Sequence, residues 1–334
     1  MTKPDISPQR WTPPRVPTKP RYLPMPNLEI HPVPGSGPEH VLPAPDGHLL
    51  TGLADGRIIS YDPETRRHTL VVDTGGRPLG LGWHPDGSLL ICDTARGLLR
   101  HHPDGALQTL ATGYGGKPST FCSNVAAAAD GTIYFSHSST KFNEANWTGD
   151  LFEHRPTGQL FRLSPDGALD LMLDQLAFAN GVILAPDQSF VLVAETTGYD
   201  LLRVELTGDR QGAVSRFGDA LPGFPDNITA GSDGNIWVAL PAPRVKSMDF
   251  LLPRNPLWRK AIWALPDRLR PQPAPTSAVR VLDSRGDIVY DFHGTYHGFA
   301  NPTAVCQVED KAWMAGLFYK ALASFDLPEP SGQL

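Results

Sequence analysis

The sequence lacks several features that would assign a function class at once. Its 334 residues include only three cysteines, Cys92, Cys122 and Cys306, which lie far apart in apolar runs. Such a set is no disulfide framework, and no neighbouring cation would stabilise a thiolate. No apolar stretch approaches the roughly 18 residues of a membrane span, and the start, MTKPDISPQRW, has no apolar signal segment. We therefore expect a cytoplasmic protein without a membrane partner.

Basic residues are also too few for a nucleic-acid binder. The chain has 29 Lys and Arg against 35 Asp and Glu, a net charge of -6. Phosphate-dependent affinity needs clustered Lys and Arg, so nucleic acid is excluded as a partner. The chain also has no G-x-S-x-G elbow, no H-E-x-x-H pair, no phosphate loop and no C-x-x-C pair. None of these motifs competes with the site described below.

Glycine and proline, by contrast, are abundant and indicate many turns. Eleven of the 34 prolines fall within residues 1–38, where apolar residues show no sustained period. We expect residues 1–26 to form an extended, Pro-rich arm and residues 27–334 to form a single propeller domain.

After the arm, an Asp-Gly-like turn followed by an apolar run recurs six times. The turn aspartates are spaced by 40, 44, 57, 46 and 77 residues. A period in the forties with repeated hairpin turns is typical of propeller blades, and each copy continues with two further strand-like runs. The sequence therefore predicts an all-β, six-bladed β-propeller with four-stranded blades. The six turns begin at Asp46, Asp86, Asp130, Asp187, Asp233 and Asp310.

The last copy of the repeat has only three strand-like runs, and two of the spacings between turn aspartates are wider than one four-stranded blade needs. The alternating segment Leu28–His31 of the arm could supply the missing strand and remove an exposed sheet edge. The wide spacings come from insertions at residues 137–157 and 241–275, each between the second and third strands of a blade. The second insertion predicts a helix around 257–269. Both insertions should cover the face on which the innermost strands begin.

A set of oxygen-bearing side chains opens the innermost strands at a nearly constant offset. Glu39, Asn180 and Asp226 lie seven residues before their turn aspartates, and Asn124 lies six before. Equivalent positions converge on the axis of a propeller, so two carboxylates and two amides should meet, and Asn227 adds a further oxygen. All-oxygen ligation with two negative charges suits Ca²⁺ before Mg²⁺ and argues against zinc.

Strand direction predicts what surrounds this ion. The ends of second strands bring Asp93 and His137 to the same rim, and links between blades bring Arg77 and Phe178. A general base for attacking water could be Asp226, Asp93 or His137, in falling order.

These residues resemble a known group, the calcium-dependent six-bladed propellers that comprise strictosidine-synthase-like proteins, gluconolactonases of the senescence-marker type (SMP-30) and paraoxonases. The stretch from Ala179-Asn180-Gly181-Val182 to Phe224-Pro225-Asp226-Asn227-Ile228 is similar to the strictosidine-synthase-like branch, and Gly37-Pro38-Glu39 to the lactonase branches. The resemblance implies calcium ligation by Glu39, Asn124, Asn180, Asp226 and Asn227.

Three positions depart from these relatives. The stretch Gly298–Pro302 has no carboxylate where strictosidine synthase has a catalytic Glu, which disfavours amine–aldehyde condensation. Leu79 stands where paraoxonases have a His, and Val125 where several lactonases have an Asp. The best interpretation is a calcium-dependent hydrolase of a rather hydrophobic lactone or ester. The alternative is a non-catalytic propeller that binds a small molecule or partner and holds a structural Ca²⁺. The sequence leaves the oligomeric state open.

Overall fold

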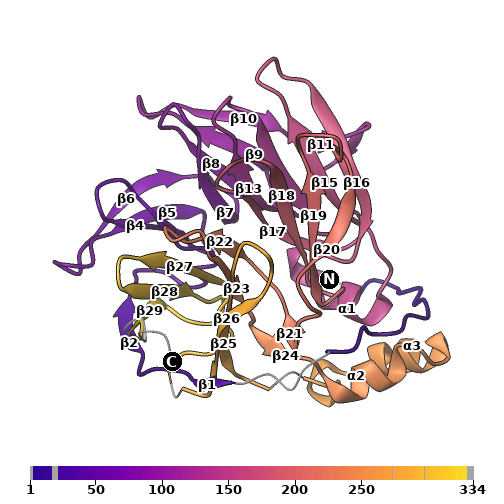
Figure 1. Ribbon diagram of the computed structural model, residues 1–334. Helices are drawn as coiled ribbons and strands as arrows, with labels where there is room; N and C mark the ends of the chain where they lie inside the picture. Colours follow the sequence, from indigo (N-terminus) through magenta and orange to yellow (C-terminus); the bar gives the residue numbers. More distant parts are fainter. Residues whose placement is uncertain (1–2, 17–21, 273, 297, 329–334) are drawn as a thin grey trace.

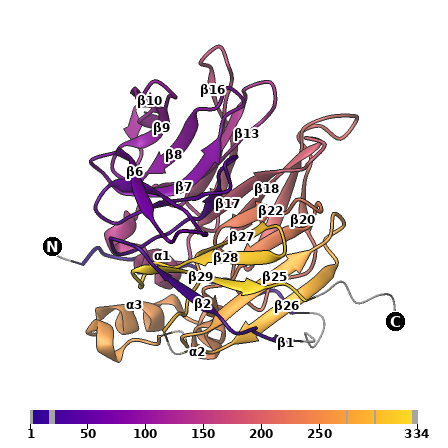
Figure 2. The ribbon, with the colours of Figure 1, turned by 90° about the vertical axis from the view of Figure 1, so that its left-hand side faces the viewer.

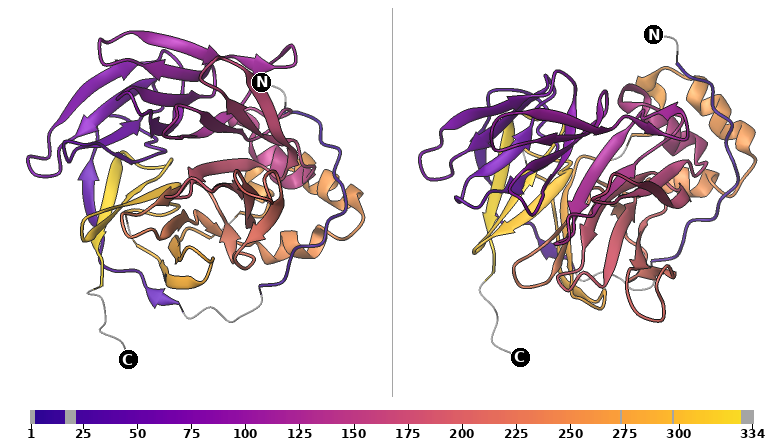
Figure 3. Two further views of the ribbon diagram at one scale, coloured as in Figure 1. Left: turned by 45° about the horizontal axis from the view of Figure 1, so that its top comes forward. Right: turned by 90° about the horizontal axis from the view of Figure 1, so that it is seen from above.

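Six antiparallel sheets stand around a common axis, which confirms the predicted six-bladed β-propeller (Figures 1 and 3). The computed structural model describes residues 3–16, 22–272, 274–296 and 298–328. Five of the blades are built from four consecutive or nearly consecutive strands. The sixth takes its outer strand from the beginning of the chain.

The strands follow the repeat closely, from the innermost to the outermost in each blade. Blade 1 has β3 (Leu42–Pro43), β4 (Leu49–Gly52), β5 (Arg57–Tyr61) and β6 (His68–Asp73); blade 2 has β7 (Pro78–Trp83), β8 (Leu89–Asp93), β9 (Gly97–His101) and β10 (Leu107–Ala111); blade 3 has β13 (Cys122–Ala127), β14 (Ile133–His137), β15 (Gly158–Leu163) and β16 (Leu169–Leu176). Blade 4 has β17 (Ala179–Leu184), β18 (Phe190–Glu195), β19 (Asp200–Glu205) and β20 (Val214–Phe217); blade 5 has β22 (Ile228–Ala230), β23 (Ile236–Ala239), β25 (Ser277–Leu282) and β26 (Ile288–Gly294); blade 6 has β27 (Ala304–Val308), β28 (Lys311–Ala315), β29 (Ala321–Asp326) and β2 (Glu29–Pro32).

The repeated aspartates fix the turns between the first and second strands. In five blades the carboxylate accepts a hydrogen bond from the backbone N–H two residues later, at 2.8 to 3.1 Å. This side-chain contact closes the turn without help from distant residues. The apolar residues of neighbouring blades then pack against each other, as in the cluster of Ile183, Leu192 and Val238 between blades 4 and 5.

The ring closes as the sequence predicts. β2 pairs antiparallel with β29, with His31 opposite Leu322 (Figure 2). The buried His31 ring contacts Tyr61 Oη at 3.0 Å and Ser324 Oγ at 2.9 Å, and so ties the closing strand to blades 1 and 6. One strand is additional: β1 (Leu23–Pro24) pairs in parallel with β26, so blade 5 has a fifth strand that the repeat does not contain.

The two insertions carry all the helices of the described residues. The first, between β14 and β15, has η1 (Glu144–Asn146) and α1 (Thr148–Glu153). The second, between β23 and β25, has α2 (Lys246–Leu251), α3 (Pro256–Ala264) and η2 (Asp267–Leu269), so the predicted helix is interrupted before Pro266. We call the two insertions the cover. There are also two short ribbons. β11 (Gly113–Tyr114) pairs with β12 (Lys117–Pro118) in the link between blades 2 and 3, and β21 (Gly223–Phe224), in the link between blades 4 and 5, pairs with β24 (Ala242–Pro243) of the second insertion.

Residues 3–16 of the arm are extended, as expected, but they are bound to the cover (Figure 3). Ile6 is fully buried among Phe142, Phe152 and Trp263. Trp263 Nε1 donates to the carbonyl of Pro4 at 2.9 Å, and Arg244 Nη1 donates to that of Pro14 at 2.6 Å. The arm therefore joins the two insertions to each other, a function that its composition did not indicate.

Candidate metal centre and active site

The axial ends of the innermost strands depart from regular pairing, and this departure directs their side chains to the axis. The β13–β14 register shifts between Cys122 and Val125, and the β17–β18 register shifts between Ala179 and Val182. These irregularities contain Asn124 and Asn180. A bulge in a strand redirects side chains in this way. The crowding is tight: a Cβ on Gly181 would lie 2.4 Å from the backbone nitrogen of Ile228, so only glycine fits.

Three of the five predicted oxygen-bearing residues, Glu39, Asn124 and Asn227, form one hydrogen-bonded group. Asn227 Nδ2 donates to Glu39 Oε1 at 2.8 Å, and Asn227 Oδ1 accepts from Asn124 Nδ2 at 2.6 Å. Asn180 Oδ1 accepts from Ser123 Oγ and Asn180 Nδ2 donates to Thr196 Oγ1, both at 3.2 Å, and the Asn180 amide lowers the pKa of the neighbouring Asp226 carboxyl. The five predicted residues come from blades 1, 3, 4 and 5, so the constant offset in the sequence corresponds to convergence in space. We call them the axial group.

The electrostatics of the axial group are those of a site with excess negative charge. Burial raises the pKa of Glu39 to about 7, even though the Asn227 hydrogen bond and Arg77 lower it. Burial, and then the charge of Glu39, raise the pKa of Asp226 well above its usual range. Glu39 Oε2 is buried and has no hydrogen-bond partner. Two desolvated carboxylates facing each other with an unpartnered oxygen fit a hard cation.

Apolar side chains lie beside the axial group. Leu79, Phe121 and Phe178 are each at most 6% exposed and form one cluster, against which Trp147 of the cover packs. The rings of Phe121 and Phe178 meet edge to face, with centroids 5.4 Å apart. Leu79, which replaces a histidine of the paraoxonases, is thus part of an apolar wall.

One ion pair connects the cover to the axis. Arg77 Nη1 donates to the carbonyl of Gly37, two residues before Glu39, at 2.8 Å, while Arg77 Nε donates to Glu144 Oε1 of the cover at 3.0 Å. Arg77 and Glu144 both influence the pKa of Glu39, in opposite directions. Sequence reasoning placed Arg77 on this rim but missed Glu144 and Trp147, because the insertions lie outside the repeat and offer no offset to count.

The structure does not bring Asp93 to the axial group. The Asp93 carboxylate is fully buried and accepts hydrogen bonds from Thr74 Oγ1 at 2.7 Å and from the backbone nitrogens of Ala95 and Arg96 at 2.9 and 3.0 Å. These contacts cap the turn after β8. A carboxylate with both oxygens engaged in this way is poorly placed to accept a proton from water.

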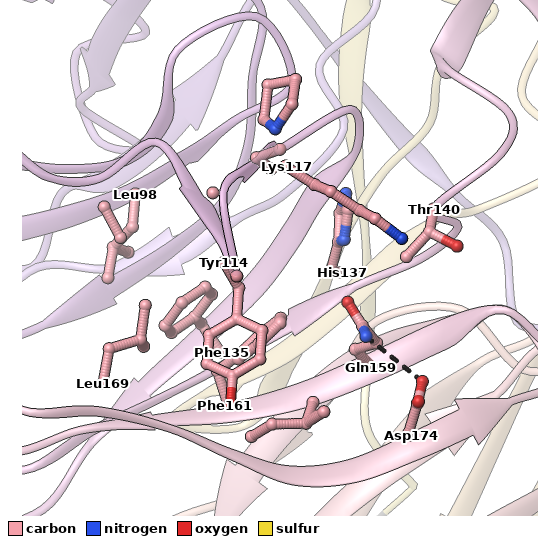
Figure 4. A pocket seen from close by; sticks show the side chains of 16 residues that line it. Leu98, Tyr114, Lys117, Phe135, His137, Thr140, Gln159, Phe161, Leu169 and Asp174 are labelled. Atoms are coloured by element: carbon pink, nitrogen blue, oxygen red, sulfur yellow. Dashed lines mark hydrogen bonds between the residues drawn. The ribbon is translucent and has the colours of Figure 1, made fainter.

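His137 also faces away from the axial group. Its Nε2 accepts hydrogen bonds from the backbone nitrogens of Thr120 and Phe121 at 3.0 and 2.9 Å. Burial lowers the pKa of His137 to about 4, so the ring is neutral. Its outer side lines a separate pocket of about 370 Å³ between the β11–β12 ribbon and blade 3, together with Lys117 and Gln159 (Figure 4). Of the three predicted bases, only Asp226 belongs to the axial group.

Comparison with known proteins identifies the family. The family model described as SMP-30/Gluconolactonase/LRE-like region matches residues 49–249, and the model described as Strictosidine synthase-like, N-terminal matches residues 26–61. The first match covers more than half of the chain. This protein therefore belongs to the SMP-30/gluconolactonase/LRE-like family, and the resemblance seen in the sequence is confirmed.

Curated relatives come from plants and animals. Protein STRICTOSIDINE SYNTHASE-LIKE 13 of Arabidopsis thaliana is 35% identical over 245 residues, covering 65% of this chain and 60% of the relative. The adipocyte plasma membrane-associated protein of Mus musculus is 34% identical over 237 residues, covering 65% and 57%. The matched region thus spans about three fifths of the length of these relatives.

Solved structures confirm the propeller fold. A gluconolactonase from Xanthomonas campestris superposes with a TM-score of 0.66 at 18% identity, covering 98% of this chain and 99% of that one. Regucalcin, a calcium-binding protein from Agrobacterium tumefaciens, gives a TM-score of 0.59 at 13% identity, covering 89% and 91%. Within the described part of this chain, no helix is long and apolar enough to cross a membrane.

Proposed function

We propose that this protein is a metal-dependent hydrolase of lactones or esters and that its ion is Ca²⁺. The observation that carries the proposal is the axial group, in which the buried Glu39 and the half-buried Asp226 concentrate negative charge in one place and Glu39 Oε2 has no partner. Membership of a family that includes gluconolactonases supports lactone chemistry at the class level. A calcium-binding structural neighbour supports the choice of ion.

The donor set of the axial group suits the ion. Glu39 and Asp226 supply two negative charges, and the amides of Asn124, Asn180 and Asn227 supply neutral oxygens, which together match the hard ligands that Ca²⁺ prefers. Asn124 Oδ1 accepts a hydrogen bond from the Val182 backbone nitrogen at 3.0 Å, which fixes the orientation of that amide. When bound here, the cation would polarise the substrate carbonyl and stabilise the negative charge that develops on its oxygen.

Asp226 is the residue that we assign as general base. It is half-buried, and it is the only one of the three predicted bases that lies in the axial group. One of its carboxylate oxygens takes a proton from water as the water oxygen bonds to the carbonyl carbon. The ring C–O bond of the lactone then breaks, and that proton passes to the leaving alkoxide. The products are a carboxylic acid and an alcohol.

We expect the apolar wall to determine which substrates fit. Leu79, Phe121 and Phe178 exclude water from one side of the axial group and can contact only the apolar part of a substrate. Burial of each methylene contributes roughly 0.8 kcal/mol, so an alkyl or aryl lactone should bind more tightly than a free sugar lactone.

The test is turnover of a panel of γ-, δ- and aryl lactones and aryl esters, followed by pH-stat titration. We expect hydrolysis that is abolished by a chelator and restored by Ca²⁺, with calcium content measured in parallel by elemental analysis. Turnover that survives complete removal of metal would contradict metal dependence.

A non-catalytic binding propeller is the second candidate, because Asp93 and His137 both have their acceptor atoms engaged in structural hydrogen bonds. If the protein retains Ca²⁺ but hydrolyses no member of the panel, this function replaces the first. Amine–aldehyde condensation has less support, because Gly298–Pro302 contains no carboxylate.

A further inference from the structure

The first turn of helix α3 departs from the ordinary pattern of a surface helix, although Trp263 in its second turn is buried and Lys260 is exposed. Arg259 is fully buried, whereas Leu257 and Trp258 on the same helix are 67% and 57% exposed. A helix on a globular protein normally turns its apolar side to the core and its charges to water. Here one charged side chain, Arg259, is inside, while the neighbouring Leu257 and Trp258 face outwards.

The orientation of α3 is fixed by specific contacts. Arg259 Nη1 donates to the carbonyls of Phe152 and Glu153 at 3.0 and 3.1 Å, and Arg259 Nη2 donates to the carbonyl of Gln9. One turn later, Trp263 is buried and bonded to the arm. Rotating the helix to bury Leu257 would therefore leave a guanidinium and several carbonyls without partners, which costs more than the exposed leucine.

The exposed apolar side chains extend beyond α3. Phe250 on α2 is 55% exposed and Leu269 on η2 is 61% exposed, with Leu265 between them in the chain. These helices project from one side of the ring (Figure 1). We call Phe250, Leu257, Trp258, Leu265 and Leu269 the outer face of the cover.

Basic residues are concentrated in the same segment. Residues 244–270 contain seven Lys and Arg against two Asp, a net charge of +5 in a chain whose total is -6. Lys246, Arg254, Lys260 and Arg268 are exposed. The opposing acids are few: Asp5 of the arm pairs with Lys260, Asp267 pairs with Arg270, and Asp249 accepts from Tyr199.

We propose that the outer face of the cover binds the surface of an anionic lipid bilayer. Exposed Trp, Phe and Leu flanked by Lys and Arg are the combination that inserts into the headgroup boundary while the cations contact anionic lipid. The segment's positive charge on an otherwise acidic protein argues for this occupant over a second copy of the chain, whose identical positive segment would be repelled.

The proposal departs from our expectation that the protein has no membrane partner, and the vesicle experiment below tests that expectation. Binding to anionic lipid is compatible with the predicted cytoplasmic location, because the cytoplasmic leaflet carries anionic lipid. The proposal does not depend on hydrolysis, since lipid binding is measured without a substrate.

The experiment is co-sedimentation of the full chain with vesicles of phosphatidylcholine alone or with about 30% phosphatidylserine. We expect the anionic vesicles to bind at least about tenfold more tightly and the difference to shrink as salt is raised. Leu257→Ser with Trp258→Ser should abolish binding, and Lys260→Glu with Arg268→Glu should reduce it to the level of neutral vesicles.

Matched controls separate this surface from general effects. Leu70→Ser removes another exposed leucine, on β6, and Arg285→Glu reverses an exposed charge in the turn between β25 and β26. Both should bind vesicles as the wild type does, and all variants should keep its thermal midpoint. The proposal fails if wild-type protein does not sediment with anionic vesicles, if the controls lose binding equally, or if sedimentation velocity shows a dimer that the Leu257/Trp258 variant no longer forms.

Discussion

The two ends of the innermost strands carry the same kinds of residue under opposite conditions. At the turn end, Asp130 and Asp187 are exposed, and hydrogen bonds from Thr132 and Ser189 hold the pKa of each carboxyl below its usual range. At the axial end, Glu39 is buried and Asp226 is half-buried, and desolvation raises the pKa of each. A carboxylate whose hydrogen bonds are complete stabilises its turn, whereas a desolvated pair of carboxylates with an oxygen that lacks a hydrogen-bond partner is available for a ligand.

The largest effect is expected from removing charge at the axial end. Asp226→Asn leaves one carboxylate in the axial group and removes the assigned base, so Ca²⁺ affinity should fall at least about 100-fold and lactone turnover should become undetectable. Calcium titration by calorimetry and the pH-stat assay measure the two effects. Asp187→Asn, at the turn end, is the matched control and should change neither Ca²⁺ affinity nor turnover. Equal losses in both variants would show that the axial carboxylate has no special role.

The pH dependence of stability tests the same difference between the turn end and the axial end. Raised carboxyl pKa values favour the protonated acids in the folded, metal-free protein, so this contribution to stability is present below pH about 4.5 and is lost as pH rises through about 7. Thermal midpoints in chelator should therefore fall over that range, and Ca²⁺ should reverse the fall. Asp150 and Glu195, whose pKa values burial also raises to about 7, act in the same direction.

Glu39→Gln identifies the share of this pH effect that belongs to Glu39. The glutamine cannot ionise, so the thermal midpoint of this variant in chelator should fall less than that of the wild type as pH rises.

Protons also compete with the cation, so wild-type Ca²⁺ affinity should rise roughly tenfold between pH about 6 and about 8. An affinity that is independent of pH would show that Glu39 is not a ligand.

A smaller effect is expected where the arm meets the cover. Ile6→Ser places a hydroxyl in the apolar cluster of Phe142, Phe152 and Trp263, at a cost of about 2 to 4 kcal/mol to the local structure. Hydrogen exchange should accelerate in α1, α2 and α3 but not in the blades. Exchange that accelerates equally in the blade strands would show that the arm belongs to the propeller core.

Much of the fold could be predicted from the sequence because the repeat encodes it locally. In five of the six blades the turn aspartate closes its own hairpin. Alternating apolar residues assign the strands to blades, so blade number and the closing strand Leu28–His31 followed without tertiary information. The axial residues were found for the same reason, since a rotational repeat converts equal offsets into convergence.

The remaining features depend on contacts between residues far apart in the chain. Asp93 and His137 end their strands near the expected rim, but hydrogen bonds to Thr74, Thr120 and neighbouring backbone nitrogens turn their acceptor atoms away. The burial of Arg259 beside the exposed Leu257 and Trp258 follows from hydrogen bonds to carbonyls about a hundred or more residues away in sequence, one of which belongs to the arm. The repeat sets the backbone geometry, whereas the direction of each of these side chains depends on the distant residues that the closed ring brings next to it.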